Sequence, residues 1–247
     1  MYTKNGKGYV HDNIGSAVSC IQKLGVANGF KVETTNDASV MSEQKLKQFT
    51  MVIFASTNND VFDNNGQRLA FRRYIEAGGQ FLGIHAALAT ERNWTWFKNL
   101  LGGTLSWHAH FQKYKVRVID KGHPSTEGLP AVWEKEDECY FNREVYPGGH
   151  VLLAQDLSSL DRSDTVEMNK IISTVGKNGA LYPATWTKKF DGGTIFITAL
   201  GHDKRDYSDP VFVKHIFQGM KWLVAEAKPL DYTQSYAINR DSPLKSK

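Results

Sequence analysis

The chain has 247 residues, of which 41% are hydrophobic and 23% are charged, so it can bury one large core. It carries 30 Lys and Arg against 26 Asp and Glu, a net charge of +4, and the basic residues are scattered and form no stripe, which argues against nucleic acid as a partner. No run reaches the roughly 18 apolar residues of a membrane span, which argues against a membrane protein.

The N-terminus lacks the basic start and apolar run of a signal peptide, so we expect a soluble protein. Residues 1–4 lead directly into a Gly-rich loop with little of a first strand, as after removal of a leader. A periplasmic or secreted location follows if a leader has been removed, and a cytoplasmic one otherwise. Cys20 and Cys139 are too few to define a disulfide framework. The sequence does not decide whether a homo-oligomer forms.

The first third of the chain alternates predicted strands and helices. The predicted strands are residues 2–3, 30–34, 51–55 and the apolar run before His85. The predicted helices begin near Asp12, Ser42 and Leu69. This alternation predicts βαβ units, and therefore an α/β fold with a parallel sheet.

Later segments extend the pattern. A helix is predicted at 94–101 and another from Asp209. The predicted strands are 114–119, 151–154, 171–175 and 194–200. We expect one domain, residues 1–228, followed by a loosely packed C-terminal tail, residues 229–247.

The segment 78–87 is the centre of the pattern: two glycines are followed by a short apolar strand and then by His85, which precedes two alanines. It predicts a buried strand that enters a sharp turn into a helix, with His85 at the exposed position where related folds hold a nucleophile. Ligands of parallel sheets bind beyond the carboxyl ends of the strands. The candidate site loops are therefore residues 5–11, 56–60 and 85–87.

Residues 108–112 form a second pattern. In an extended segment His108, His110 and Gln112 would project from one face. Two imidazoles on one side can hold a divalent metal ion, so His108 and His110 are candidate metal ligands. A hydrogen-bonded sugar site or plain surface histidines are the alternatives, and no other cofactor is indicated.

Other candidates lie at predicted loop ends. His202 directly follows the last strand, and His11 opens a helix. Glu138 and Tyr140 lie in or beside the acidic stretch 134–138, which otherwise reads as a solvated face. A histidine at a packed turn is the structural alternative for His85 and His202.

The elbow Gly83-Ile84-His85-Ala86-Ala87 resembles the class I glutamine amidotransferase-like superfamily, in which a Cys follows Gly-x. Here the residue is His85, and without a thiolate glutaminase chemistry cannot begin. Residues 2–225 more specifically resemble the ThuA-like, trehalose-utilization-type family. The matching segments are residues 9–11, 56–60, 70–75, 83–87, 108–112, 123–126, 137–140, 200–202 and 207–210. The resemblance implies a three-layer, flavodoxin-like, class I glutamine amidotransferase-like fold with a mostly parallel central sheet.

The resemblance also implies a function in sugar catabolism, notably on disaccharides oxidised to 3-keto glycosides. A base would remove the acidified C2 proton, and isomerisation or elimination and hydrolysis would follow. The expected catalytic residues are His85, His202, His108 and Glu138. The expected residues for binding the carbohydrate are His11, Thr57, Asp60, Gln112, Tyr140 and Trp186.

The chain departs from the family pattern at two places. A His-Pro-x-x-Gln motif lacks its proline at Ala109, and a His-Pro-x-x-Trp motif has Tyr182 in place of its histidine. If that histidine is catalytic in relatives, this chain works differently. The alternative to an enzyme is therefore a carbohydrate-binding or regulatory domain.

Overall fold

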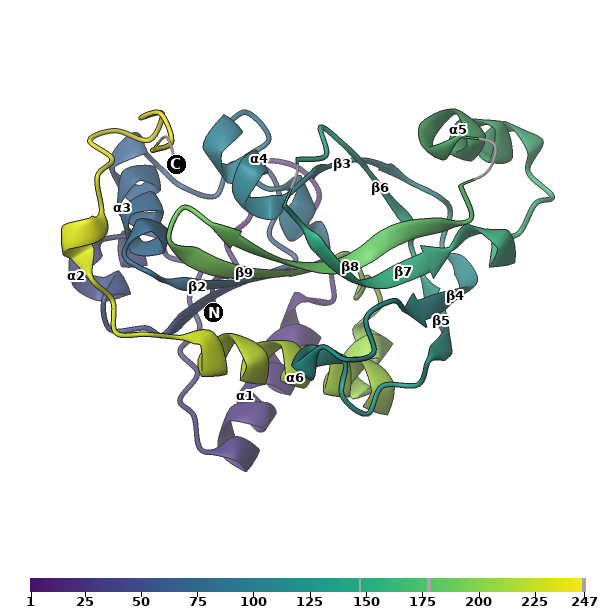
Figure 1. Cartoon of the computed structure of the whole chain (residues 1–247), viewed down its shortest axis with the longest axis horizontal. Coiled ribbons are helices and arrows are strands. Elements are labelled where there is room, and N and C mark those ends of the chain that lie inside the picture. The colour runs from purple at the N-terminus through teal and green to yellow at the C-terminus, as the bar shows by residue number, and fades with distance from the viewer. Residues whose placement is uncertain (147, 177–178, 246–247) are drawn as a thin grey trace.

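A seven-stranded sheet runs through the molecule (Figure 1). The computed structural model describes all residues except 147, 177–178 and 246–247. In spatial order the strands are β1 (Met51–Ala55), β2 (Gln80–Ile84), β9 (Gly193–Thr198), β8 (Leu181–Phe190), β7 (His150–Asp156), β4 (Gln112–Val118) and β5 (Val132–Asp137). A separate two-stranded sheet pairs β3 (Thr104–His108) with β6 (Tyr140–Arg143).

The α/β class is confirmed, but the sheet is mixed instead of mostly parallel. Strands β1, β2 and β9 pair in parallel, whereas the pairs from β9 to β5 are antiparallel. The β8–β9 connection explains part of this difference. Asp191 and Gly192 have φ angles of 49° and 97°, as in a tight hairpin turn, and strands joined so closely can pair only antiparallel.

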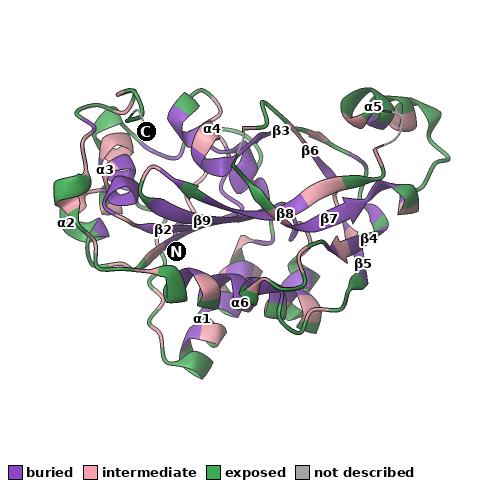
Figure 2. Ribbon diagram, viewed as in Figure 1, coloured by how far each residue is buried: buried purple, intermediate pink, exposed green. Residues whose placement is uncertain are grey.

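Helices cover both faces of the sheet and complete three layers (Figures 1 and 2). Helices α1 (Ile14–Asn28) and α6 (Pro210–Glu226) pack on one face, and α3 (Asn65–Glu76) and α4 (Thr95–Leu101) on the other. The short helix α2 (Glu43–Leu46) lies beside α3, and α5 (Thr165–Val175) lies at the far end of the sheet. Among the described residues, the helices lack the length and apolar character needed to cross a membrane.

Two predicted strands are wrong. Residues 30–34 form no strand, and only Thr35 makes an isolated bridge, to Tyr2. Residues 171–175 belong to α5, because the Asp164 side chain accepts hydrogen bonds from the amides of Val166 and Glu167 and so starts a helix.

The C-terminal segment is not loosely packed as predicted. Glu76 of α3 accepts hydrogen bonds from the amides of Tyr236 and Ala237. Arg72 is fully buried and donates to the carbonyl groups of Arg240 and Ser242. These contacts hold the segment against α3 in the described part of the chain.

Candidate active site

His85 lies at the end of β2, in the predicted elbow. Its φ angle of +52° is left-handed, and the chain then enters a short 3-10 helix, His85–Ala89. Such backbone strain in a residue with a side chain concentrates at functional sites. The sequence predicted an exposed position for His85, but its side chain is fully buried. This burial lowers the pKa of His85 well below its usual value.

The orientation of the His85 ring is fixed. Its Nδ1 lies 2.9 Å from the carbonyl oxygen of Ala199, which follows β9. A neutral ring therefore donates from Nδ1 and presents the lone pair of Nε2. The hydroxyl of Tyr140 lies 2.8 Å from that Nε2 atom. The elbow thus aims one unprotonated nitrogen toward the carboxyl end of the sheet.

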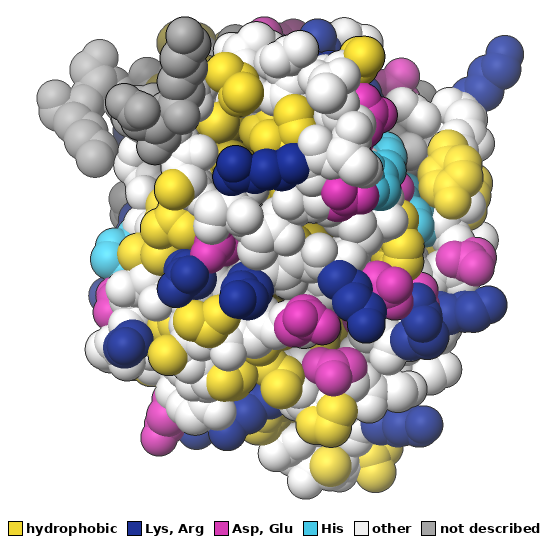
Figure 3. All heavy atoms as spheres, turned by 90° about the vertical axis from the view of Figure 1, so that its right-hand side faces the viewer, with side chains coloured by type: hydrophobic (Ala, Val, Ile, Leu, Met, Phe, Trp, Pro, Cys, Tyr) yellow, Lys and Arg dark blue, Asp and Glu magenta, His cyan; other side chains and the backbone are white. Residues whose placement is uncertain are grey.

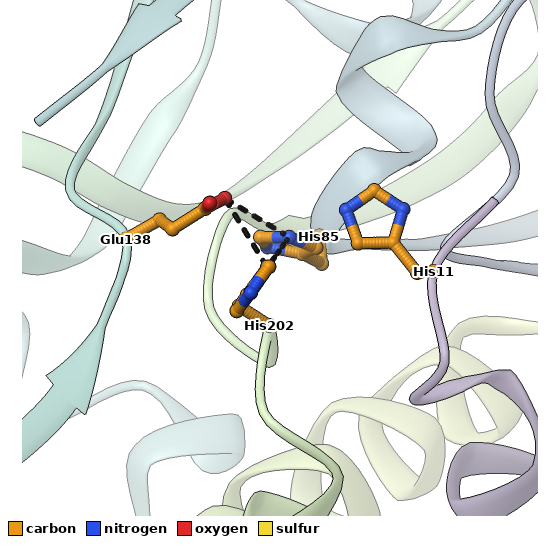
Figure 4. A group of neighbouring side chains, drawn as sticks. All are labelled: His11, His85, Glu138 and His202. Atoms are coloured by element: carbon orange, nitrogen blue, oxygen red, sulfur yellow. Dashed lines mark hydrogen bonds and ion pairs between the residues drawn. The ribbon is translucent and has the colours of Figure 1, made fainter. Parts of the chain in front are cut away.

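His202 and Glu138 meet His85 at this nitrogen (Figure 4). His202 Nδ1 lies 3.2 Å from His85 Nε2 and 3.2 Å from Glu138 Oε2. The hydrogen bond with Glu138 raises the pKa of His202. Burial opposes ionisation of Glu138, but the hydrogen bond with His202 and the nearby histidines outweigh it and lower the pKa of that carboxyl.

His11 completes the group from the N-terminal loop (Figure 4). Its ring centroid lies 4.9 Å from that of His85 and 5.5 Å from that of His202. Burial, reinforced by His202, lowers the pKa of His11 to about 4, so the ring is uncharged at neutral pH. We call the four residues His11, His85, Glu138 and His202 the histidine–glutamate cluster.

Asp137 holds the loops that carry this cluster. Its carboxylate accepts hydrogen bonds from the amides of Gly201, at 2.8 Å, and His202, at 3.1 Å. It also accepts the amide of Glu138 and pairs with buried Lys135 at 3.1 Å. The acidic stretch is therefore no solvated face at this residue: Asp137 is fully buried and ties the end of β5 to the loop after β9.

The cluster borders an open cleft of about 580 Å³. The cleft is lined by Tyr9, His11, Asn58, Ala86, Ala89, Arg92, Leu105, Ser106, Trp107, His108, Glu138, Tyr140 and His202. His85 lies behind Tyr140 and His202 and does not line it. The volume falls within the range of small-molecule sites.

His108 ends β3 at the edge of this cleft, with 43% of its side chain exposed. Its Nδ1 lies 3.0 Å from the carbonyl oxygen of Ala109 and 3.4 Å from Glu138 Oε1. These two acceptors favour a proton on Nδ1 and leave the Nε2 lone pair. His108 thus joins the predicted site.

The structure gives the two predicted metal ligands different partners, because His108 lies beside Glu138 whereas His110 lies beside Glu167. The His110 ring contacts Glu167 of α5 at 2.8 Å, and the chain breaks strand geometry between β3 and β4. Gln112 also turns away from the cleft and accepts a hydrogen bond from the amide of Asp161.

Besides Gln112, three more predicted substrate-binding residues lie outside the cleft. Thr57 is buried and its hydroxyl lies 2.8 Å from that of Thr90. Asp60 lies near Arg68, at 3.9 Å, and Trp186 is buried with its indole donating to the carbonyl of Leu101. Of the six expected residues, His11 and Tyr140 line the cleft.

Sequence reasoning missed Asn58 and Arg92 as individual lining residues. Asn58 falls within the predicted loop 56–60, and Arg92 follows the elbow by seven residues, so both lie beyond strand ends. Trp107, which also lines the cleft, lies on β3, a strand that was not predicted. Tyr182, which replaces the family histidine, lies elsewhere: its hydroxyl contacts the backbone of Asn142.

Comparisons agree with this architecture. A family model described as ThuA, trehalose utilisation, matches residues 1–223. A protein described as ThuA-like from Bacteroides uniformis ATCC 8492 is similar to this chain, with 24% identity and a TM-score of 0.73 over 94% of this chain and 92% of that chain. A second, from Parabacteroides merdae ATCC 43184, has 19% identity and a TM-score of 0.65 over 90% of this chain and 88% of that chain.

A cold-adapted β-galactosidase from Rahnella sp. R3 shares the fold over 87% of this chain but 28% of its own, with 15% identity and a TM-score of 0.54. Among curated proteins, no relative matches the chain.

Proposed function

Because this chain belongs to the ThuA, trehalose utilisation, family, we propose that it is a sugar-catabolic enzyme that acts on a 3-keto disaccharide or glycoside by general acid/base chemistry. A small-molecule carbohydrate would then occupy the cleft. The observation that carries the proposal is that His108, with Glu138 beside it, faces the same cleft as His202 and Tyr140.

The base in this proposal is His108. A general base needs an unprotonated nitrogen at the substrate and a group that fixes its tautomer. Ala109 and Glu138 lie at Nδ1, so Nε2 is the nitrogen that takes the proton from C2 of the sugar. The electron pair of the C–H bond then forms the C2–C3 double bond of an enediolate, with negative charge on the C3 oxygen.

His202 on the cleft stabilises that oxygen when its ring is protonated, the form that the neighbouring Glu138 carboxylate favours by raising the pKa of His202. Transfer of the C2 hydroxyl proton to the C3 oxygen, followed by return of the proton from His108 to C3, leaves the ketone at C2 and completes isomerisation. Alternatively, the C1–O bond breaks and the departing oxygen takes the proton, after which water adds to C1 and the sum is hydrolysis.

Incubation of the purified chain with a 3-keto disaccharide tests this function. We expect consumption of the sugar, and we expect His108→Ala to lower kcat by at least about 100-fold, since general base catalysis contributes about 10²–10⁴-fold. The matched control is His110→Ala, which removes an exposed imidazole two residues away, outside the cleft. Its turnover should remain near that of the wild type.

Equal turnover by the His108→Ala variant would reject this base. No consumption by any form, together with measurable binding of the sugar, would instead support a carbohydrate-binding or regulatory domain.

A further inference from the structure

The histidine–glutamate cluster brings ligand-type atoms from four separate segments to one point. One ligand atom of each of the four residues lies within 4.8 Å of the other three (Figure 4). The residues come from the N-terminal loop, the β2 elbow, the link between β5 and β6, and the loop after β9. Convergence from four segments is costly for a packed interior unless something holds these polar groups together.

The cluster holds few protons for its lone pairs: the Tyr140 hydroxyl lies 2.8 Å from His85 Nε2, and His202 Nδ1 can carry one more. His85 presents an unprotonated Nε2, because Nδ1 donates to the carbonyl of Ala199. Glu138 Oε2 accepts only, and it lies 3.6 Å from this nitrogen. His202 Nδ1 faces both atoms at 3.2 Å and can place a single proton between them. A cation would satisfy all three lone pairs at once.

The spacing also fits a metal ion. Zinc binds imidazole nitrogen and carboxylate oxygen at about 2.0–2.1 Å, so two ligand atoms of a tetrahedral site lie about 3.3 Å apart. The three distances that link His85, His202 and Glu138 are 3.2, 3.2 and 3.6 Å. The three atoms therefore already form one face of such a site.

His11 supplies an independent observation. It is 7% exposed, and its Nδ1, which lies on the side of the ring away from His85 in Figure 4, is buried without a hydrogen-bond partner among the described residues, so Nε2 is the nitrogen that faces the cluster. A neutral buried imidazole with an unused nitrogen is costly in a packed site but suits a metal ligand.

The surroundings resemble those of metal-binding histidines. Such residues usually donate their second N–H to a carboxylate or a backbone carbonyl, as His85 does to Ala199. The second carboxylate oxygen of Glu138 faces His108 at 3.4 Å, which orients Oε2 toward the cluster. Asp137 fixes the backbone of both Glu138 and His202.

We propose that the histidine–glutamate cluster binds one divalent transition-metal ion at the edge of the cleft. Three imidazoles and one carboxylate suit ions such as Zn²⁺ or Mn²⁺ better than Mg²⁺, which prefers oxygen ligands. With the ion bound, His202 would be an uncharged ligand, and the ion in place of the imidazolium would polarise the ketone oxygen while His108 acts as base. This role in catalysis rests on the function proposed above, whereas the binding of the ion does not.

Calorimetric titration of the full chain, first stripped with EDTA and dialysed, tests the site. We expect one Zn²⁺ per chain with Kd below about 1 μM, and much weaker binding of Mg²⁺. His11→Asn and His202→Asn should each weaken Zn²⁺ binding by at least about 100-fold, because even outer-shell changes cost about 10–100-fold. His110→Asn, the same change on an exposed histidine outside the cluster, should retain wild-type affinity.

Loading with Co²⁺ gives a second readout. The wild type should show the intense visible absorption of a low-coordinate Co²⁺ site, and the His11→Asn variant should lose it. Circular dichroism establishes that each variant is folded, and if His202→Asn unfolds, the His11→Asn result decides.

Absence of stoichiometric Zn²⁺ binding, or unchanged affinity in folded His11→Asn, would overturn the metal site. Turnover of the 3-keto sugar by the EDTA-stripped chain would leave the proposed function intact in that case. Tight Zn²⁺ binding without turnover would support the site and reject the function.

Discussion

Asp137 shows how one side chain sets the geometry of the site. Its carboxylate accepts three backbone amides and pairs with Lys135, and all of this lies in the protein interior. Hydrogen bonds to a buried charge are strong in such surroundings, and a group left without its partner is costly. The relative positions of Glu138 and His202 therefore depend on a residue that does not line the cleft.

We predict that Asp137→Asn lowers the free energy of unfolding by about 2–4 kcal/mol. The amide cannot reproduce the charge, and it leaves the Lys135 ammonium with fewer partners. Urea denaturation measures the change. Glu136→Gln, the neighbouring exposed carboxylate, is the control and should stay within about 0.5 kcal/mol of the wild type. Equal stability of the two variants would contradict this role for Asp137.

Helix α6 shows how an element imposes a protonation state. His215 on this helix packs against the sheet and is almost completely buried. Its Nε2 lies 3.1 Å from the Thr198 hydroxyl and 3.3 Å from that of Thr185. Burial, with a contribution from Lys135, lowers the pKa of His215 to about 3. Helix α6 therefore packs against the sheet with the His215 imidazole in its neutral form.

This packing predicts a loss of stability in acid. The folded pKa of His215 is depressed below the unfolded value of 6.5, so its contribution is full above pH 6.5 and is lost as the pH falls toward 3. Between pH 7 and pH 5 the loss from this group is about 2 kcal/mol. Denaturation of the wild type and of His215→Leu at both pH values measures this loss. The slope of the unfolding free energy against pH should be shallower in the variant, so that the wild type loses about 2 kcal/mol more between pH 7 and pH 5. Identical slopes would show that the unfolded and folded pKa values are alike.

At the scale of the whole molecule, the C-terminal segment is part of the fold. The guanidinium of Arg72 is fully buried, 2.9 Å from Glu76, and depends on carbonyl groups of Arg240 and Ser242. The indole of Trp94 also donates to Arg240. The segment therefore links α3 to the residue that precedes α4.

On the molecular face at the α5 end, basic and acidic side chains intermingle, with no basic stripe in that view (Figure 3).

We predict that removal of residues 231–247 lowers the free energy of unfolding by at least about 3 kcal/mol. The truncation leaves the buried Arg72–Glu76 pair without its backbone partners, and incomplete buried ion pairs are strongly destabilising. Chemical denaturation of the full and truncated chains tests this. Unchanged stability would mean that the segment is an appendage, as the sequence first suggested.

Several features of the fold could be predicted from the sequence because they depend on neighbouring residues. The apolar run of β2 and the glycines around it marked the elbow of His85, and Gly29 marked the end of α1, where its φ angle is +72°. Each of these features depends on residues close together in the chain. The family resemblance added the fold and the candidate histidines.

The tertiary structure decided the rest, because the remaining features depend on contacts between distant segments. Residues 171–175 have strand-like composition, yet Asp164 starts a helix there. His108 and His110 are two residues apart but face different carboxylates, whereas His11 and His202 lie far apart in the chain and meet at His85. Sequence spacing fixes direction only within one regular element, and it is the packing of the strand ends, held by Asp137, that gathers the site.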